Sequence, residues 1–345
     1  MKKKTRTGIV LWSIFGLFLL FTGLFFWGGY RMFGEEMKAI RSLREIRPGV
    51  YTFTFEGDYG FDAFLSQGGA KTDAQMALYI ASFLSHGYIK APAPDITVEG
   101  CSSLGTGDLF LRNFDFSYPG NYVIIKAIPQ NGYKSISTGN FAFMGGGRDW
   151  HPVSGMKDTF MALATLYVPL DGMNEKGLCV ADLISIDGQT SVPDTPKGDL
   201  TIVAAIRLLL DKAADVDEAE ELLGKYDVFP SIGSAHHLAL SDAKGKSAVF
   251  EWKDGILIRT DTPALTNHEI SGEGGDDPRI AESISRLGKL LCAGSATTAG
   301  EGFKILEQVH YDPDTRWSIV YDKKNLTGTW CFPPDWENKV EVTLP

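Results

Sequence analysis

Hydrophobic and polar positions alternate in short runs along most of the chain, which predicts groups of β-strands separated by groups of helices. Val50–Phe55 and Tyr59–Phe64 are expected to be strands, and the capping-box pattern Thr72-Asp-Ala-Gln75 is expected to begin a helix. An extended stretch then leads into Gly100 and Cys101. Further strands are expected at Leu109–Arg112, Tyr122–Ile128, Ser135–Phe143, Ala164–Val168, Leu178–Ile184, His237–Leu240, Ser247–Trp252, Ile256–Arg259, Trp317–Tyr321 and Leu326–Cys331. Further helices are expected at Ile202–Ala213, Val216–Leu223, Ile280–Leu291 and Thr298–Val309.

This order of elements favours an α+β fold. Strands gathered apart from helices build two packed antiparallel sheets with helices outside them, whereas a strict strand–helix alternation would build a parallel sheet. The chain has 345 residues, of which 44% are hydrophobic, so it can bury a large core in one large domain or two ordinary ones.

The N-terminus has a different pattern from the rest of the chain. Three lysines and an arginine precede an uncharged, apolar run from Gly8 to Tyr30. That run matches the ~20 residues that span a bilayer, and no small-residue cleavage site follows it. We therefore expect residues 1–33 to form a cytoplasmic basic leader and an uncleaved signal-anchor helix, with a cleaved signal peptide as the alternative. Because the cationic end should stay in the cytoplasm, the body of the protein is expected on the extracytoplasmic face of the membrane.

Charge and cysteine content exclude several classes of protein. The net charge is −10, and it is −14 without the four cations of the leader, so nucleic acid is not an expected partner. The four cysteines are too few for a disulfide scaffold and lack the paired spacing of a zinc site. Phosphate-loop and dinucleotide motifs are missing as well, so no metal or cofactor is expected. The sequence does not decide whether Cys292 and Cys331 form a disulfide.

Cys101 stands out because it lies between Gly100 and two serines instead of within an apolar run. A cysteine nucleophile needs a base, and none of the six histidines has a sequence context that nominates it. An α-amino group, which titrates near ~7.7–8.0, could take the proton if the chain began at Cys101. Gly100 lets the preceding peptide adopt the strained geometry in which the thiol attacks the Gly100 carbonyl. The sequence thus predicts self-cleavage between Gly100 and Cys101.

Arg112 and Asp115 follow on the next expected strand. They are three residues apart, so both can reach Cys101 at the strand end if the backbone bends between them. Asp115 could then orient the α-amino group, while Arg112 could hold the thiolate and a substrate oxygen by its charge. The alternative is an ordinary ion pair at the surface of the protein.

Short motifs occur in a characteristic order along the chain: Cys101-Ser-Ser, Arg112-Asn-Phe-Asp115, Asp171-Gly-Met-Asn-Glu-Lys-Gly-Leu178 and Leu265-Thr-Asn267. Together they resemble the choloylglycine hydrolase family of linear amide C–N hydrolases, which belongs to the N-terminal nucleophile hydrolases. The hundred residues before Cys101 depart from its closest members. They resemble instead the self-cleaving precursors similar to acyl-CoA:isopenicillin N acyltransferase and acid ceramidase.

The resemblance implies a four-layer αββα sandwich, with residues 34–100 as a propeptide and residues 101–345 as the N-terminal nucleophile hydrolase domain. It makes Cys101 the nucleophile, its α-amino group the base, and Asn267 an oxyanion donor. A later site arginine is best matched by Arg286, with Arg279 as the competitor. Bile salt enzymes carry a further oxyanion-binding asparagine at the place of Ile184, where only a backbone N–H could serve.

The implied reaction is hydrolysis of a small, linear N-acyl amide through a thioester, with the propeptide held non-covalently after cleavage. An acyltransferase that uses the same thioester is one alternative. A catalytically silent, membrane-anchored binding domain is another. Phe141, Phe143 and Trp150 could line an apolar acyl pocket, although aromatic residues in such strands are more often part of the core.

Overall fold

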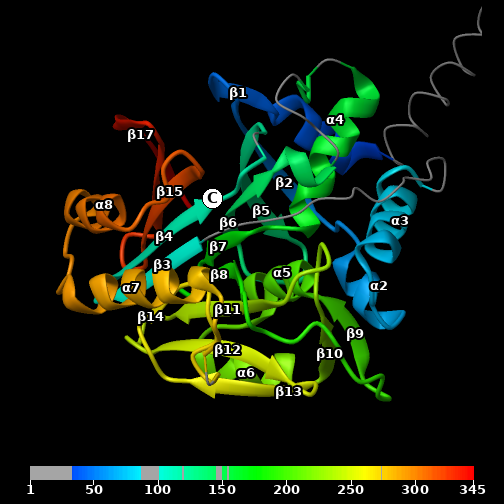
Figure 1. Ribbon diagram of the computed structural model, residues 1–345. Helices are drawn as coiled ribbons and strands as arrows, with labels where there is room; N and C mark the ends of the chain where they lie inside the picture. Colours follow the sequence, from blue (N-terminus) through cyan, green and yellow to red (C-terminus); the bar gives the residue numbers. More distant parts are fainter. Residues whose placement is uncertain (1–32, 87–100, 119, 145–149, 154, 273) are drawn as a thin grey trace, which may run out of the picture.

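The structure is a computed structural model that describes residues 33–86, 101–118, 120–144, 150–153, 155–272 and 274–345 (Figure 1). The expected signal anchor and Gly100 lie outside these residues. Residues 33–42 are helical, and no helix of the described part is both long and apolar enough to span a bilayer.

The larger sheet has nine strands, and all neighbouring strands except one pair are antiparallel. The exception is β2 and β5, which run parallel over eight residue pairs from Val50↔Tyr122 to Gly57↔Pro129. The pattern of short strands predicted antiparallel sheets throughout, and for this pair that prediction is wrong. In spatial order the strands are β1 (Arg44–Arg47), β2 (Val50–Gly57), β5 (Tyr122–Pro129), β6 (Ser135–Asn140), β7 (Asp171–Asn174), β8 (Cys179–Ile184), β11 (His236–Ser241), β12 (Ser247–Lys253) and β13 (Ile256–Thr260).

The smaller sheet has six strands, all antiparallel, and carries Cys101 at the start of one of them. Its spatial order is β14 (Ala264–Leu265), β3 (Cys101–Thr106), β4 (Leu109–Asp115), β15 (Thr315–Asp322), β16 (Thr327–Phe332) and β17 (Asp335–Thr343). A separate parallel pair is formed by β9 (Gly198–Thr201) and β10 (Tyr226–Phe229).

The two large sheets pack face to face, and helices cover their outer faces (Figure 1). One apolar cluster, which includes Phe114 and Trp317, lies between the sheets. A second cluster joins the larger sheet to its helices, and a third joins the smaller sheet to α7 and α8. Besides the helical residues 33–42, the described helices are α2 (Phe61–Ser66), α3 (Asp73–Leu84), α4 (Met156–Leu163), α5 (Ile202–Lys212), α6 (Val216–Leu223), α7 (Pro278–Cys292) and α8 (Ala299–Gln308), with short 3₁₀ turns η1 (Phe141–Met144) and η2 (Ala164–Tyr167). The order of layers is therefore helix, sheet, sheet, helix.

Two expected strands are helical in the structure. Gly60, which has φ of +77°, ends the extended backbone, and Phe61–Ser66 forms α2. Phe61 and Phe64 are both buried at a spacing of three residues, which suits one face of a helix although the sequence also alternates like a strand. The expected strand Ala164–Val168 is instead the 3₁₀ turn that follows α4. The expected strand Ser135–Phe143 ends at Asn140 and continues as η1.

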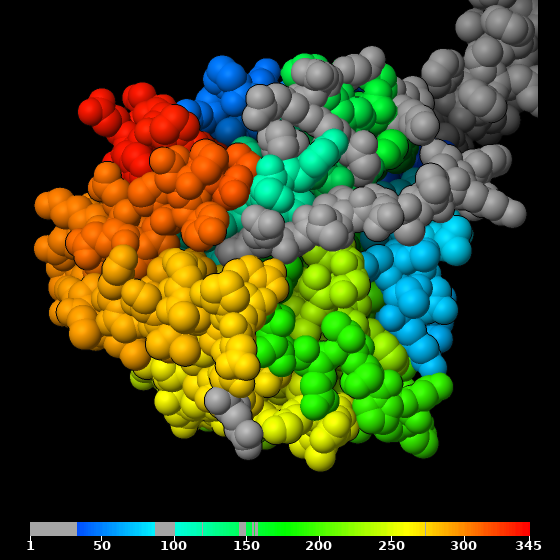
Figure 2. Space-filling model, in the orientation of Figure 1, coloured from blue at the N-terminus to red at the C-terminus, as the bar shows by residue number. Residues whose placement is uncertain are grey.

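The N-terminal segment, which we define as residues 33–86, is part of the main fold. It supplies β1 and β2 to the larger sheet and α2 and α3 to the helical layer. The space-filling view shows α2 and α3, in light blue, lying directly against the green part of the chain that carries β9 (Figure 2). The Tyr59 hydroxyl donates to Asp211 on α5, and the Tyr167 hydroxyl donates to the Tyr59 carbonyl. The predicted division into a propeptide and a domain at Cys101 stays a prediction, but the N-terminal segment shares a sheet and a core with the rest of the described chain.

Candidate active site

Cys101 is the first residue of β3 and pairs with Phe114 of β4. Its side chain is buried, with 2% exposure, between the two sheets. The Cys101 Sγ lies 3.8 Å from Arg112 Nη2 and 4.0 Å from the Asp115 carbonyl oxygen. A tight hairpin therefore brings a cation and a carbonyl group to the thiol.

Arg112 is held in place by the larger sheet. Its Nη1 donates to the Leu170 carbonyl at 2.8 Å, and its Nε lies 3.3 Å from Asp171 Oδ2. Asp171 also accepts hydrogen bonds from Trp317 Nε1 and the Tyr321 hydroxyl. Arg112 is fully buried, so its charge acts on the thiol without competition from bulk water. The alternative of a surface ion pair is excluded by this burial.

Asp115 points toward the other side of β4, beside α7. Its Oδ1 accepts a hydrogen bond of 2.5 Å from the Thr315 hydroxyl, and its Oδ2 is 3.5 Å from Arg286 Nη1. The register of β4 and β15 is irregular between Thr315 and Trp317, opposite Phe114 and Asp115 at the end of β4. Burial raises the pKa of Asp115 to about 7, although Arg286 and the Thr315 hydroxyl oppose this rise.

Asn267 follows β14 and reaches Cys101 with its side chain. Its Oδ1 accepts from the Cys101 backbone N at 2.6 Å and from Arg286 Nη2 at 2.8 Å. Its Nδ2 donates to the Ile184 carbonyl at 2.9 Å. One hydrogen of Nδ2 is left for another acceptor. Ile184 thus contacts this site through its carbonyl group, which accepts the hydrogen bond from Asn267.

The structure places only one of the two candidate arginines, Arg286, beside Cys101. Arg286 lies on α7 with 4% exposure and donates from Nη1 to the Cys101 carbonyl at 3.2 Å. Arg279 lies at the exposed start of α7, where it pairs with Asp277 at 2.6 Å. α7 begins there because Asp277 caps it and Pro278 occupies its first turn, which places Arg286 two turns later on the buried face.

The thiol is held in its protonated form. Burial raises the pKa of Cys101 to about 12, the Arg112 guanidinium lowers it, and the Asp115 and Asp182 carboxylates raise it further. A thiolate therefore needs a base at neutral pH. The backbone nitrogen of Cys101, which would be the α-amino group after cleavage before this residue, is already directed at Asn267.

Sequence reasoning missed several residues that support the site. Thr315 bonds Asp115, and the Ser283 hydroxyl accepts from the Asn267 backbone N at 2.7 Å. Asp182 is paired with His236 at 2.9 Å and contributes to the electrostatics of Cys101. Hydrogen bonds from hydroxyl residues to partners far away in the sequence leave no periodic signal in it. Only Asp182, an acidic residue within an expected buried strand, could have been noticed.

The remaining cysteines and aromatic residues have structural positions. Cys292 and Cys331 are free thiols, so the disulfide that the sequence left open is not formed. Phe141 and Trp150 pack together, with ring centroids 5.1 Å apart, on the helical side of the larger sheet. Phe143 lies between the sheets and stacks on Phe116 at 5.2 Å. Of the three aromatic candidates for an acyl pocket, Phe143 is thus the one on the inter-sheet side.

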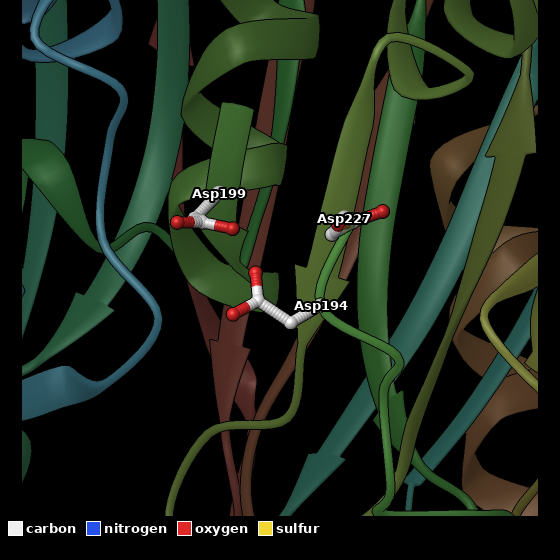
Figure 3. A group of neighbouring side chains, drawn as sticks. All are labelled: Asp194, Asp199 and Asp227. Carbon is white, nitrogen blue, oxygen red and sulfur yellow. The ribbon is translucent and has the colours of Figure 1, made fainter. Parts of the chain in front are cut away.

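Asp194, Asp199 and Asp227 form a group of carboxylates at the β9–β10 pair (Figure 3). Lys71 Nζ lies 2.7 Å from Asp194 and 3.9 Å from Asp199, so a cation of the N-terminal segment offsets part of their charge. Asp227 Oδ2 accepts from the Thr195 backbone N at 2.8 Å. We interpret this group as an electrostatic contact between the N-terminal segment and the rest of the fold.

The layered sheets, with a cysteine at the start of an inner strand, define the fold class of the N-terminal nucleophile hydrolases. A variant of conjugated bile acid hydrolase from Clostridium perfringens is similar, with a TM-score of 0.51, 18% identity, and coverage of 71% of this chain and 92% of that one. Penicillin V acylase from Agrobacterium tumefaciens gives a TM-score of 0.48 at 16% identity, covering 71% of this chain and 86% of that one. An N-acylethanolamine-hydrolyzing acid amidase orthologue from Caenorhabditis elegans gives 0.42 at 13%, covering 72% of this chain and 100% of that one.

The chain belongs to the acyl-coenzyme A:6-aminopenicillanic acid acyl-transferase family, whose model matches residues 159–336, more than half of its length. The match contains Asn267 and Arg286, while Cys101, Arg112 and Asp115 precede it. No curated protein was found to match the chain significantly.

Proposed function

We propose that this protein is an N-terminal cysteine hydrolase that cleaves a linear, non-peptide amide bond through a thioester. The observation that carries the proposal is the set of contacts around one residue. The backbone N of Cys101 bonds Asn267 Oδ1, its carbonyl bonds Arg286, and its Sγ faces Arg112. All four residues are buried together.

The first step of the proposal is self-cleavage. Cys101 Sγ attacks the Gly100 carbonyl carbon, the C–N bond breaks, and the acyl group moves to sulfur while the nitrogen gains a proton. Water then hydrolyses this thioester, which restores the thiol and leaves the α-amino group of Cys101 free. The freed amine supplies the base, a role for which the sequence nominates none of the histidines. The pKa of an α-amino group is far closer to neutrality than that of the buried thiol.

Turnover repeats the same chemistry on a substrate. The α-amino group accepts the thiol proton while Sγ attacks the amide carbonyl, and it then protonates the departing amine. Water hydrolyses the thioester and releases the acid. Asn267 Nδ2 has one hydrogen left to donate to the oxyanion, and Arg112 stabilises the thiolate. Asp115 and Asn267 Oδ1 orient the amino group as acceptors.

An apolar acyl group fits the surroundings of the thiol. Phe114, which pairs with Cys101, has its ring 5.9 Å from that of Phe116. Phe116 in turn lies 6.5 Å from Tyr118, which is 52% exposed. Aromatic side chains thus extend from the thiol to the surface, and we infer that the acyl part of the substrate lies along them.

A second candidate function is acyl transfer, which the description of the matched family favours. The same thioester would then react with an amine in place of water. Incubation of the protein with an N-acyl amide and an added amine would separate the two, since transfer yields a new amide and hydrolysis yields only the free acid.

The test of the common mechanism is whether Cys101 becomes an amino terminus. Purified full-length protein is expected to divide into pieces of 100 and 245 residues without added protease, at a rate independent of protein concentration. Cys101→Ala should abolish both cleavage and amine release from a panel of N-acyl amides. Cys331→Ala, which removes another buried free thiol, is the matched control and should retain both. A fully active enzyme in which Cys101 stays internal would overturn the proposal.

We further propose that the protein is anchored in the membrane by residues 1–33, with its body on the extracytoplasmic face, and that the N-terminal segment is retained after cleavage. The eight-pair contact of β2 with β5 and the buried bond of Tyr59 to Asp211 support retention. The small N-acyl amide substrate would then be hydrolysed outside the cytoplasm.

A further inference from the structure

A pocket of about 400 Å³ lies at the end of β3 opposite Cys101. Cys101 begins β3 and Thr106 ends it, so the two ends are about 16 Å apart at ~3.3 Å per residue. The pocket is lined by the β3–β4 turn, the β11–β12 turn, the residues that follow β13, and Lys323 after β15. It is therefore separate from the candidate active site.

Lys323 is the unusual residue of this pocket, because its side chain is buried with 4% exposure. Its Nζ donates to the Ser241 hydroxyl at 2.7 Å and to the Asp242 carbonyl at 3.0 Å. Both acceptors are neutral, and no ion pair joins Lys323 to a carboxylate among the described residues, although buried charges are usually paired. The ammonium group therefore has one N–H donor left, and no carboxylate in contact with it offsets its charge.

A second donor stands next to that ammonium group. Ser241 and Ser247 share one hydrogen bond of 3.0 Å, and Ser241 already accepts from Lys323. Two hydroxyl protons are present, and the hydrogen bond between the serines uses only one of them. The other proton has no acceptor among Ser241, Ser247 and Lys323. The serines can lie this close to β3 only because Gly105 has no side chain, since a Cβ there would come within 2.4 Å of Ser247 Oγ.

The rim of the pocket adds further cations. Lys246 and Arg259 line it, and so does the exposed Asp261, which pairs with Arg259 at 2.7 Å. Lys246 and Arg259 both also contact Asp217. Arg259 contacts Glu220 as well, so carboxylates balance the charges of both rim residues. Among the described residues that line the pocket, Lys323 is thus the cation without a carboxylate in ion-pair contact, and an anion from outside would supply one.

We propose that this pocket binds the oxyanion group, phosphate or carboxylate, of a small organic molecule. An oxyanion would accept hydrogen bonds from Lys323 Nζ and the free serine hydroxyl, and its charge would offset that of the buried ammonium group. The volume is at the lower end of small-molecule sites, so the pocket holds more than the anionic group alone. The proposal does not depend on the chemistry proposed for Cys101.

The test is titration of purified full-length protein with inorganic phosphate, and separately with acetate, by calorimetry at constant ionic strength set with chloride. Saturable binding of at least one anion is expected, and the identity of that anion assigns the phosphate or carboxylate source. Binding should weaken at least tenfold in Lys323→Met and in Ser247→Asp, which keeps the lysine but places a carboxylate in the pocket. The matched control is Lys324→Met, an exposed neighbour, which should bind like the wild type.

Two outcomes would overturn the proposal. The first is that neither anion binds above the chloride control, which would leave Lys323 as a purely structural tie between β15 and β11. The second is that binding persists unchanged in Ser247→Asp, which would place the anion elsewhere, for example at Arg112 and Arg286. Because Ser247→Asp leaves Lys323 in place, it decides the matter even where Lys323→Met fails to fold.

Discussion

Asp115→Asn tests the electrostatics of the site through the pH dependence of stability. Burial raises the pKa of Asp115 from 3.8 to about 7 in the folded chain. Between these two values the unfolded chain has lost the proton while the folded chain still holds it. Protonated Asp115 therefore stabilises the folded chain fully only below the pKa that this carboxyl has in the unfolded chain. This contribution is lost as the pH rises to about 7.

The magnitude depends on the width of that interval. Each pH unit within it lowers the free energy of unfolding by about 1.4 kcal/mol, so the loss approaches about 4 kcal/mol between pH ~4 and ~7. Asparagine does not titrate, so the Asp115→Asn variant does not share this loss. The altered bond to Thr315 changes the stability of the variant by an amount that does not depend on pH. The free energy of unfolding of the variant, minus that of the parent, should therefore rise by about 4 kcal/mol between pH ~4 and ~7 and stay constant above that.

The assay is urea unfolding of full-length protein from pH 4 to pH 8, with Cys101→Ala in both proteins so that the chain stays whole. Asp277→Asn at the exposed start of α7 is the control. Arg279 lowers the pKa of Asp277, so its contribution is present at neutral pH and lost on acidification, and the difference should move in the opposite direction. A pH-independent difference for Asp115→Asn would show that Asp115 is ionised in the folded chain and would refute the reasoning.

Three other predictions concern catalysis, the N-terminal segment and topology. Asn267→Ala should lower self-cleavage and turnover by about 10²–10³, the usual loss for one oxyanion donor, and an unchanged single-turnover rate would contradict its role. Tyr59→Phe should lower the free energy of unfolding, measured in urea, by about 1–3 kcal/mol, because Asp211 loses a buried hydrogen-bond donor. An unchanged unfolding midpoint would show that this hydrogen bond does not help to retain the N-terminal segment. A reporter fused after Pro345 should be active only outside the cytoplasm, and activity inside it would contradict the proposed orientation.

Local signals made part of the site predictable. Cys101, Arg112 and Asp115 lie on one hairpin, so their spacing alone places them near each other. Asn267 lies 166 residues from Cys101, and only the resemblance to a known family nominated it. Thr315 reaches Asp115 across 200 residues of sequence, and nothing in its neighbourhood distinguishes it from other threonines.

The fold was predictable to a similar extent. The pattern of short apolar runs bounded by turn residues identified most inner strands, because their side chains face a core on both sides of the sheet. It failed at Phe61 and Phe64, where a spacing of three residues suits one face of a helix while Tyr59, Phe61 and Ala63 alternate like a strand. It also failed at the parallel pairing of β2 with β5, since the direction in which two distant strands meet depends on the connection between them and not on either strand.

The position of β2 has a consequence for how a chain with Cys101 at its amino terminus can arise. A gene that encoded only residues 101–345 would leave β5 as an edge strand, with its outer N–H and C=O groups unpaired where β2 now lies. The apolar surface beneath α2 and α3 would be open to water as well. Such an edge is a template for intermolecular pairing, so we expect a product whose translation started at Cys101 to aggregate. We therefore expect the N-terminal segment to act as an intramolecular chaperone, synthesised in the same chain before the proposed cut is made.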